Sequence, residues 1–194
     1  NYHYVWNKIK HKEYVLEEWI DYLKEVSIII VRNKNDEIRT YDISENYHEG
    51  GILRKSIIPT NLDNKDIIKI NDISKKIAKA LDLQGVMTME MFIAKDGEII
   101  VNEIAARPHN SGHWTIEACD TSQFEQLVRV SMDLPLGSTN RNYDSVMLNI
   151  IGKEFYNWKN YLSAPNCFLH LYGKKEIKSG RKMGHVTKIF PKKN

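Results

Sequence analysis

The sequence predicts an α+β domain with a largely antiparallel β-sheet and flanking helices. Short runs rich in β-branched and aromatic residues recur along the chain, and turn residues separate them. Two other stretches carry apolar residues at helical spacing, and they stand between groups of strands rather than after every strand. This order favours a β-meander, a helix, a hairpin, a second helix and further strands.

The first strands are expected to form the meander. YVLEEWI (14–20) and VSIIIVRN (26–33) have the composition of strands, and IRTYDIS (38–44) follows the turn residues KNDE (34–37). NYHEGGIL (46–53) is interpreted as a glycine-containing loop. The internal domain boundary is expected within this loop. Residues 1–48 would form one part of the protein and residues 49–194 the other.

Two helices and four more strands complete the prediction. Pro59 and Asn61 precede a helix whose apolar residues recur at helical spacing, namely Ile67, Ile70, Ile73, Ile77 and Leu81. In the second helix, Ser122 and Glu125 have the spacing of a capping box, and Pro135 ends the element. The remaining strands are expected over GVMTMEMFIA (85–94), EIIVNEIA (98–105), SVMLNIIG (145–152) and NCFLHLYG (166–173).

Composition indicates a globular cytoplasmic protein. Hydrophobic residues make up 42% of the 194 residues and charged residues 27%, and no apolar run is long enough to span a membrane. The N-terminal residues lack the apolar core of a signal peptide, and because residue 1 is not Met we do not expect it to be the native start. Cys119 and Cys167 stand alone, which is typical of reduced core thiols.

The positive charge is concentrated near the C-terminus. The net charge is +3, yet the segment from Lys174 onward holds eight basic residues and one acidic residue. Such a segment fits a phosphate site, a solvated end or nucleic acid. Nucleic-acid binding would need aromatic residues interleaved with the basic ones, and only Tyr172 and Phe190 are near. We therefore expect no nucleic-acid partner.

Two glutamates are predicted to face each other in the hairpin around Asp96-Gly97. If these two residues form the loop, Glu90 on one strand pairs with Glu103 on the other. Cross-strand Cβ atoms lie only about 4.5–5.5 Å apart, so two like charges there repel each other. A shared proton or a hard cation such as Mg²⁺ would offset the repulsion. Alternatively, both side chains reach solvent at a sheet edge, or a bulge changes the register.

Further polar residues follow the second strand of this hairpin. Arg107 suits a carboxylate, bicarbonate or phosphate group, or an ion pair with a glutamate. Asn110 is a candidate oxygen ligand or a turn residue. His109 and His113 are four residues apart, but no Glu lies between them, and Pro108 and Gly112 argue against a continuous helix there, so a zinc site is disfavoured.

Several stretches together resemble one enzyme family. NEIAARPHNSGHWTIEACDTSQFEQ (102–126) closely resembles the signature of the 5-(carboxyamino)imidazole ribonucleotide synthase family, which belongs to the ATP-grasp superfamily. The shorter stretches ENYHEGGIL, GVMTMEMF, LPLG and YGKKEIKSGRKMGHVT fit the same family in the same order, so the resemblance covers about residues 14–187. It implies an ATP-grasp C-terminal domain over 49–194, preceded at 1–48 by part of the small ATP-grasp lobe with the adenine hinge.

The resemblance implies ATP-dependent carboxylation of 5-aminoimidazole ribonucleotide by bicarbonate, through carboxyphosphate, in purine biosynthesis. ATP and Mg²⁺ would be the cofactors. The ribonucleotide and bicarbonate would be the partners, and a homodimer stays open. Alternatives are another ATP-grasp ligase, such as a formate-dependent purine transformylase, or a noncatalytic nucleotide-binding protein on the same fold. Because nothing matches the family's N-terminal domain or its glycine-rich phosphate loop, we expect a fragment that is inactive by itself.

The resemblance also assigns roles to single residues. By position, the metal ligands would be Glu90 and Glu103, and the residues that bind bicarbonate or carboxyphosphate and act in catalysis would be Arg107 and His109. The ribonucleotide phosphate would be bound by Lys174 and Arg181, and the nucleotide by Glu17, Glu18, Trp19, Ile20, Glu25, His48 and Asn110. The chain departs from the family at Ala106, where Pro is common, and at Lys178-Ser179, where Arg-Pro is usual.

Overall fold

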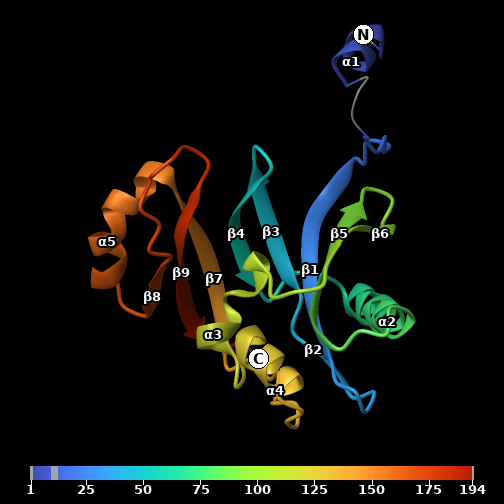
Figure 1. Cartoon of the computed structure of the whole chain (residues 1–194). Coiled ribbons are helices and arrows are strands. Elements are labelled where there is room, and N and C mark those ends of the chain that lie inside the picture. Colours follow the sequence, from blue (N-terminus) through green and yellow to red (C-terminus); the bar gives the residue numbers. More distant parts are fainter. Residues whose placement is uncertain (1, 10–12, 194) are drawn as a thin grey trace.

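The computed structural model describes residues 2–9 and 13–193. Within them the structure forms one nine-stranded sheet in the order β6-β5-β1-β3-β4-β7-β9-β8, with β2 beside β1 (Figure 1). Every strand pairing in this part of the chain is antiparallel. The predicted α+β class with a largely antiparallel sheet is confirmed.

The strands are β1 (Tyr22–Arg32), β2 (Ile38–Thr40), β3 (Ser44–Glu49), β4 (Ile52–Ile58), β5 (Gly85–Ala94), β6 (Ile99–Ala105), β7 (Tyr143–Ile151), β8 (Cys167–Leu171) and β9 (Lys182–Pro191). The α-helices are α1 (Tyr2–Ile9), α2 (Asn64–Ala80), α3 (Thr115–Ala118), α4 (Gln123–Ser131) and α5 (Trp158–Ser163). Two 3₁₀ helices, η1 (Asn110–Gly112) and η2 (Gly152–Asn157), complete the regular structure of the described residues.

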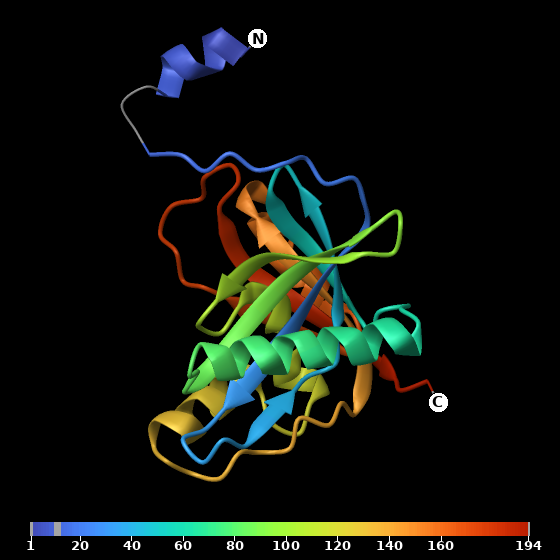
Figure 2. The ribbon, with the colours of Figure 1, turned by 90° about the vertical axis from the view of Figure 1, so that its right-hand side faces the viewer.

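One face of the sheet packs against α2, which runs across the strands (Figure 2). Alternate residues of β1 and β5 point to this face, because successive side chains of a strand point to opposite sides. They join a buried cluster with α2, whose members include Val26, Ile28, Ile30, Met87, Met89, Met91 and Ile70. The helix thus covers the apolar half of each central strand.

The opposite face is apolar at one end and polar at the other. The apolar end holds Ile29 and Val31 of β1 in a second cluster with Trp114, which is fully buried. The indole Nε1 of Trp114 donates a hydrogen bond of 2.9 Å to Ser44 Oγ. Further along the same face, Ser27 lies two residues from Ile29 on β1. Therefore the loop that carries Trp114 covers the core and ends beside a polar surface.

Most predicted elements are confirmed. The stretch 26–33 lies in β1 except for its last residue, 85–94 is β5, 98–105 contains β6, and the two helices are α2 and α4. Ser122 begins α4 as predicted, because its side chain accepts a hydrogen bond from the Glu125 backbone N–H. Both cysteines are free, as expected. No helix of the described residues is long and apolar enough to cross a membrane.

Two predictions of local structure are wrong. Residues 14–20 form no strand, because no strand of the described residues pairs with them, and Leu16 is 93% exposed. The loop expected over 46–53 is only a turn at Gly50-Gly51, since β3 and β4 extend into it from both sides. Strand β9, which lies between β7 and β8, was not predicted from the sequence.

The expected boundary between residues 48 and 49 falls inside β3. The division into two domains there stays a prediction.

Candidate active site

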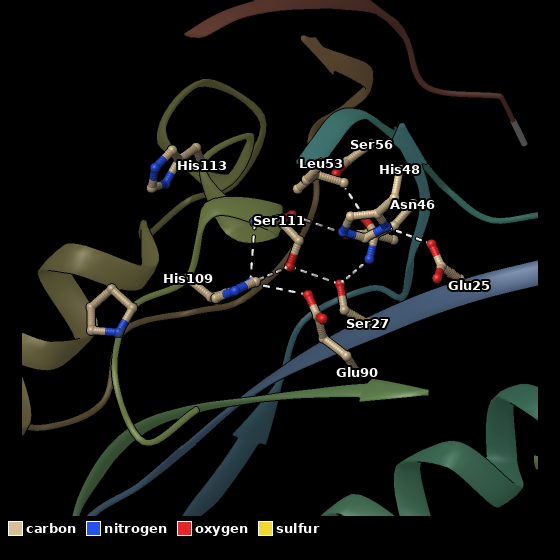
Figure 3. A network of polar contacts seen from close by, with 12 residues as sticks. Glu25, Ser27, Asn46, His48, Leu53, Ser56, Glu90, His109, Ser111 and His113 are labelled. Carbon is tan, nitrogen blue, oxygen red and sulfur yellow. Dashed lines mark hydrogen bonds and ion pairs between the residues drawn. The ribbon is translucent and has the colours of Figure 1, made fainter. Parts of the chain in front are cut away.

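The candidate site lies on the polar part of the sheet face that α2 does not cover. Glu25 and Ser27 of β1 point to this face, and Glu90 of β5 is the direct partner of Ser27. On the far side of β1, Ser44 of β3 pairs with Ser27. The alternation that buries one half of each strand against α2 therefore gathers carboxylates and hydroxyls on the other half (Figure 3).

Glu90 and Glu103 are cross-strand partners, as predicted, but the hairpin reaches this pairing by a different path. The backbone N–H of Ala94 bonds to the carbonyl of Glu98, so the turn contains three residues rather than two. A register shift between Glu90 and Met91 then accommodates one extra residue, Asn102, on the opposite strand. The longer turn and the bulge cancel each other, and the two glutamates still face each other.

The Glu90 carboxyl group is mostly buried and lacks a hydrogen bond at Oε1. Burial raises its pKa above the ordinary value; interactions with His48 and Lys182 oppose the shift, and the charge of Glu103 adds to it. Both side-chain atoms of Asn110 are also buried without a hydrogen-bond partner. Unsatisfied oxygens of this kind cost free energy unless a ligand or ion completes them. Among the described residues, no three His, Cys, Asp or Glu side chains converge on a metal site.

His109 is held at the start of η1 by contacts on both sides. Its Nδ1 atom lies 3.5 Å from Glu90 Oε1 and 3.0 Å from Ser111 Oγ. The buried amide of Gln123 clamps its backbone, because Oε1 accepts from the His109 N–H at 2.9 Å and Nε2 donates to the His109 carbonyl at 2.7 Å. Burial lowers the pKa of His109 to about 4, and the charge of Arg107 adds to this shift. The imidazole is therefore neutral at physiological pH.

Arg107 lies beside His109 and is exposed. Its guanidinium donates a hydrogen bond of 3.1 Å to the carbonyl of Pro108 and forms no ion pair with a carboxylate of the described residues. The alternative that Arg107 is used up in an ion pair with a neighbouring glutamate is therefore not supported. The guanidinium has donors left for an anion beside the His109 imidazole.

A cavity of about 420 Å³ contains the carboxylate pair. Its lining includes Glu90, Glu103, Glu25, His48, and the glycines of the β3–β4 turn. Nδ1 of His48 lies 2.5 Å from Oε2 of Glu25. The structure thus brings together four predicted site residues from four different strands.

A second cavity, of about 600 Å³, adjoins the first. Its lining includes all four residues expected at the adenine hinge, Glu17, Glu18, Trp19 and Ile20, together with Glu25 and Phe92. Glu25 lines both cavities. The hinge segment is largely exposed, and Trp19 is 88% exposed.

The two predicted phosphate ligands line neither of these cavities. Nζ of Lys174 donates to the carbonyl of Lys182 at 2.7 Å, and Arg181 Nη1 donates to the carbonyl of Glu176 at 3.3 Å. Lys178, which replaces the usual Arg, pairs with Glu176 at 2.7 Å. Both predicted ligands therefore flank the start of β9.

Lys182, Gln123 and Asn102 also lie at the candidate site, although the sequence assigned no role there to any of them. Burial lowers the pKa of the half-buried Lys182, while Glu90 opposes the shift, so its ammonium group and the carboxylate interact. Lys182 lies in the basic segment that pointed to a phosphate site, and this composition was its signal. Nothing in the sequence marked Gln123 as a site residue except its position at the start of a predicted helix.

The fold is of the ATP-grasp type. Residues 1–124 match the family described as ATP-grasp domain, and the chain belongs to this family. Residues 145–194 match a second family, described as phosphoribosylaminoimidazole carboxylase C-terminal domain.

The relatives that the chain resembles are named as synthases of one kind. The chain is 43% identical over 178 residues to N5-carboxyaminoimidazole ribonucleotide synthase of Brucella melitensis, covering 92% of this chain and 49% of the relative. It is 43% identical over 183 residues to the Bacillus subtilis synthase, covering 92% and 47%. The chain thus spans about half the length of these relatives.

Solved structures agree with the sequence relatives. An ADP complex of N5-carboxyaminoimidazole ribonucleotide synthetase superposes with a TM-score of 0.86 at 43% identity, covering 90% of this chain and 46% of the other. The Aspergillus clavatus synthase in complex with ADP and 5-aminoimidazole ribonucleotide gives a TM-score of 0.85 at 38% identity, covering 90% and 48%. The resemblance seen in the sequence is confirmed.

Proposed function

We propose that this chain supplies part of the active site of an ATP-dependent carbon–nitrogen ligase that carboxylates 5-aminoimidazole ribonucleotide with bicarbonate. The observation that carries the proposal is the juxtaposition of the Glu90–Glu103 pair with the Arg107–His109 loop on one sheet face. The similar chains named above are synthases of this kind, and one of them was solved with ADP and the ribonucleotide.

The nucleotide is assigned to the two adjoining cavities. The adenine would lie against the hinge segment 17–20 and Phe92, which line the larger cavity. Glu25 lines both cavities, and its carboxylate would accept hydrogen bonds from ribose hydroxyls. His48, which is bonded to Glu25, would lie on the phosphate side. With the adenine and ribose in these positions, the phosphates of the nucleotide would extend toward Glu90.

The donor set fits Mg²⁺. Two facing carboxylates, one of them with a buried oxygen that lacks a partner, are oxygen ligands that this ion prefers when phosphates complete its coordination. We assign Glu90 and Glu103 as its ligands and place Asn110, whose amide atoms are unpartnered, beside the phosphates. When bound, the ion would neutralise charge on the transferred phosphoryl group.

Arg107 and His109 would bind the one-carbon substrate. A bicarbonate oxygen attacks the γ-phosphorus of ATP, the bond to the bridging oxygen breaks, and ADP leaves as carboxyphosphate forms. The substrate's exocyclic amine then forms a C–N bond to the carboxyl carbon, the C–O bond to phosphate breaks, phosphate leaves, and the amine nitrogen loses a proton. The Arg107 guanidinium would stabilise anionic oxygens in both steps, and the neutral His109 would orient the intermediate. Lys174 and Arg181 would hold the ribonucleotide phosphate at the start of β9.

Two alternatives have the same fold. A formate-dependent ligase would use the same nucleotide site, and a noncatalytic nucleotide-binding protein would need no carboxylate pair next to an anion-binding arginine. The retained pair favours a ligase, and the relatives favour bicarbonate. A cytoplasmic location and a homodimer remain part of the proposal.

A chimera tests the function. Residues 13–193 would replace the matching half of the Bacillus subtilis synthase, and ADP release would be measured with ATP, the ribonucleotide, and either bicarbonate or formate. The expected result is bicarbonate-dependent turnover that Arg107→Met abolishes while circular dichroism remains unchanged. Turnover with formate alone would overturn the assignment. The chain by itself is expected to show no such turnover.

A further inference from the structure

A buried chain of polar side chains runs across the sheet to His109 (Figure 3). It connects Ser56 of β4, Asn46 of β3, Ser27 of β1 and Ser111 of η1. All four residues are at most 4% exposed. Each contact in the chain is 2.8 Å long. Water therefore cannot satisfy these groups, and each depends on its neighbour.

One donor in this network has a fixed direction. The backbone N–H of Ser111 points to Nδ1 of His109 at 3.4 Å, and the His109 side chain accepts this bond as the cap of η1. A backbone N–H can only donate, so Nδ1 must carry a lone pair. The Ser111 hydroxyl, 3.0 Å from the same Nδ1, must then also donate to it.

The remaining hydrogen bonds of the network then all run in one direction, from Ser56 toward His109. Because the Ser111 hydroxyl gives its proton to Nδ1, its oxygen is free to accept from Ser27 Oγ. Ser27 Oγ accepts from Nδ2 of Asn46, and Oδ1 of Asn46 accepts from Ser56 Oγ. No two donors or acceptors oppose each other. With the Asn46 amide oriented as in the structure and the Ser111 backbone N–H as a fixed donor, the whole network is satisfied with Nδ1 of His109 as the final acceptor.

The surroundings of Glu90 agree with this direction. Oε1 of Glu90 is 3.5 Å from Nδ1 of His109 and has no hydrogen-bond partner. This separation is longer than an ordinary N–H···O hydrogen bond, so the contact does not require a proton on Nδ1. Nε2 of His109, by contrast, has no hydrogen-bond partner within residues 2–9 and 13–193.

We infer that the chain Ser56–Asn46–Ser27–Ser111 holds His109 as the Nε2–H tautomer, so that the ring presents a hydrogen-bond donor to a carboxylate-type or carbonate-type oxygen. Ser111, Ser27 and Asn46 are positioning residues, because they act through His109. The structural inference concerns the tautomer, and its use in binding an anion rests on the proposed function. A ring fixed in this way requires no rearrangement when the anion arrives.

Long-range ¹H–¹⁵N NMR of the histidine rings tests the inference on the chain itself. At about pH 8, above the ordinary histidine pKa of about 6.5, each ring is neutral and its two nitrogens report the tautomer. His109→Gln identifies the His109 signals among the seven histidines. The expected spectrum has an unprotonated Nδ1 and a protonated Nε2. A protonated Nδ1 in the unmodified chain would overturn the inference whatever the variants show.

Substitutions test whether the network fixes the tautomer. Ser111→Ala removes the hydroxyl donor, and the two ¹⁵N shifts of His109 should move toward each other as the tautomers mix. Ser111→Thr keeps the hydroxyl and should restore the separation. Ser27→Ala, one step further away, should give a smaller shift in the same direction, and it decides the question if Ser111→Ala does not fold.

Ser74→Ala is the matched control. Ser74 is fully buried, but its hydroxyl bonds to the carbonyl of Asn71 within α2, outside the network. This variant should leave the His109 shifts unchanged. Unchanged shifts in both Ser111→Ala and Ser27→Ala would show that the network does not set the tautomer. These NMR experiments measure no turnover, so their outcomes do not depend on whether the proposed reaction is correct. A wrong tautomer would likewise leave the turnover test of the proposed reaction unaffected.

Discussion

Glu90 and Glu103 face each other across β5 and β6, but their environments differ. The side chain of Glu90 is 17% exposed, whereas Glu103 is exposed. The free-energy penalty of two adjacent negative charges therefore falls mainly on Glu90, whose pKa burial raises. A site that holds an ionised carboxylate in this way is less stable when empty than when a cation is bound.

Glu90→Gln should stabilise the chain at neutral pH when no magnesium is present. The amide keeps the shape of the side chain and removes the buried charge. An increase in Tm of about 2–4 °C is expected, the change that roughly 1 kcal/mol produces in a domain of this size. Glu103→Gln is the matched control and should change Tm less, because Glu103 is exposed. Equal or opposite effects would contradict the unequal burial.

The same contrast predicts a pH dependence. Because the pKa of Glu90 is raised in the folded state, folding favours its protonated form. The unmodified chain should therefore lose stability as pH rises through the folded-state pKa, relative to Glu90→Gln. Urea unfolding of both proteins at a series of pH values measures this difference. A difference that does not change with pH would refute the assigned cause.

Two buried histidines near the site, His113 and His185, should make the chain sensitive to acid. The ring of His185 lies 4.7 Å from that of His113 and 4.6 Å from that of His170. Burial lowers the pKa of His185 to about 3 and that of His113 to about 4. Glu117, bonded to His170 at 2.6 Å, and Lys182 are the charged groups nearby.

Folding thus disfavours protonation of the His185 and His113 rings. Their contribution to stability is complete above the unfolded pKa of 6.5 and is lost as pH falls toward about 4. His185→Gln should reduce the slope of unfolding free energy against pH in this range by up to about 1.4 kcal/mol per pH unit. His3→Gln, at an exposed position, is the control. A slope unchanged by His185→Gln would contradict the prediction.

Gln123→Met should loosen the backbone at His109. The substitution leaves the backbone N–H and carbonyl of His109 without their buried partners, at a cost of about 1–3 kcal/mol. Gln126→Met is a matched control, because the buried Gln126 clamps the backbone of Gly137 in the same way. Both variants should lose similar stability in urea unfolding. Only Gln123→Met should shift the His109 NMR signals, and a shift in both would refute a local role.

Gly112→Ala should disrupt the loop by overpacking. An added Cβ would lie 2.0 Å from Ile29 Cδ1 and 2.8 Å from Gln123 Oε1. A loss of about 1–3 kcal/mol or more is expected in denaturant unfolding. Ile29→Val removes the nearer clashing atom, so the double variant should be more stable than the sum of the two single effects predicts. Simple additivity would show that Ile29 does not restrict the position of the loop.

The sequence predicted the central strands well because their buried residues repeat with a clear pattern. It predicted the Glu90–Glu103 pairing through a two-residue turn, whereas the molecule has a three-residue turn compensated by a bulge at Asn102. The longer turn and the bulge shift the register in opposite ways, so counting positions outward from the turn cannot detect either of them. The predicted strand at 14–20 has suitable residues but no partner strand among those described.

The site was predictable where one stretch carried several chemical groups, as in the loop with Arg107 and His109. The supporting network was not predictable, because its members are far apart along the chain. Ser27 and Ser111 are separated by 84 positions. Buried serines without a neighbouring motif look the same as any other strand residues. Only the packing of β1, β3 and β4 beneath η1 brings them together.

The most direct test of the central claim is titration calorimetry of ADP and magnesium into the chimera with the Bacillus subtilis synthase. The comparison is with the same chimera carrying Glu90→Gln and Glu103→Gln. The account predicts ADP binding that magnesium strengthens in the first protein, and loss of the magnesium effect in the second. If magnesium strengthened ADP binding equally in both, Glu90 and Glu103 would not be the metal ligands.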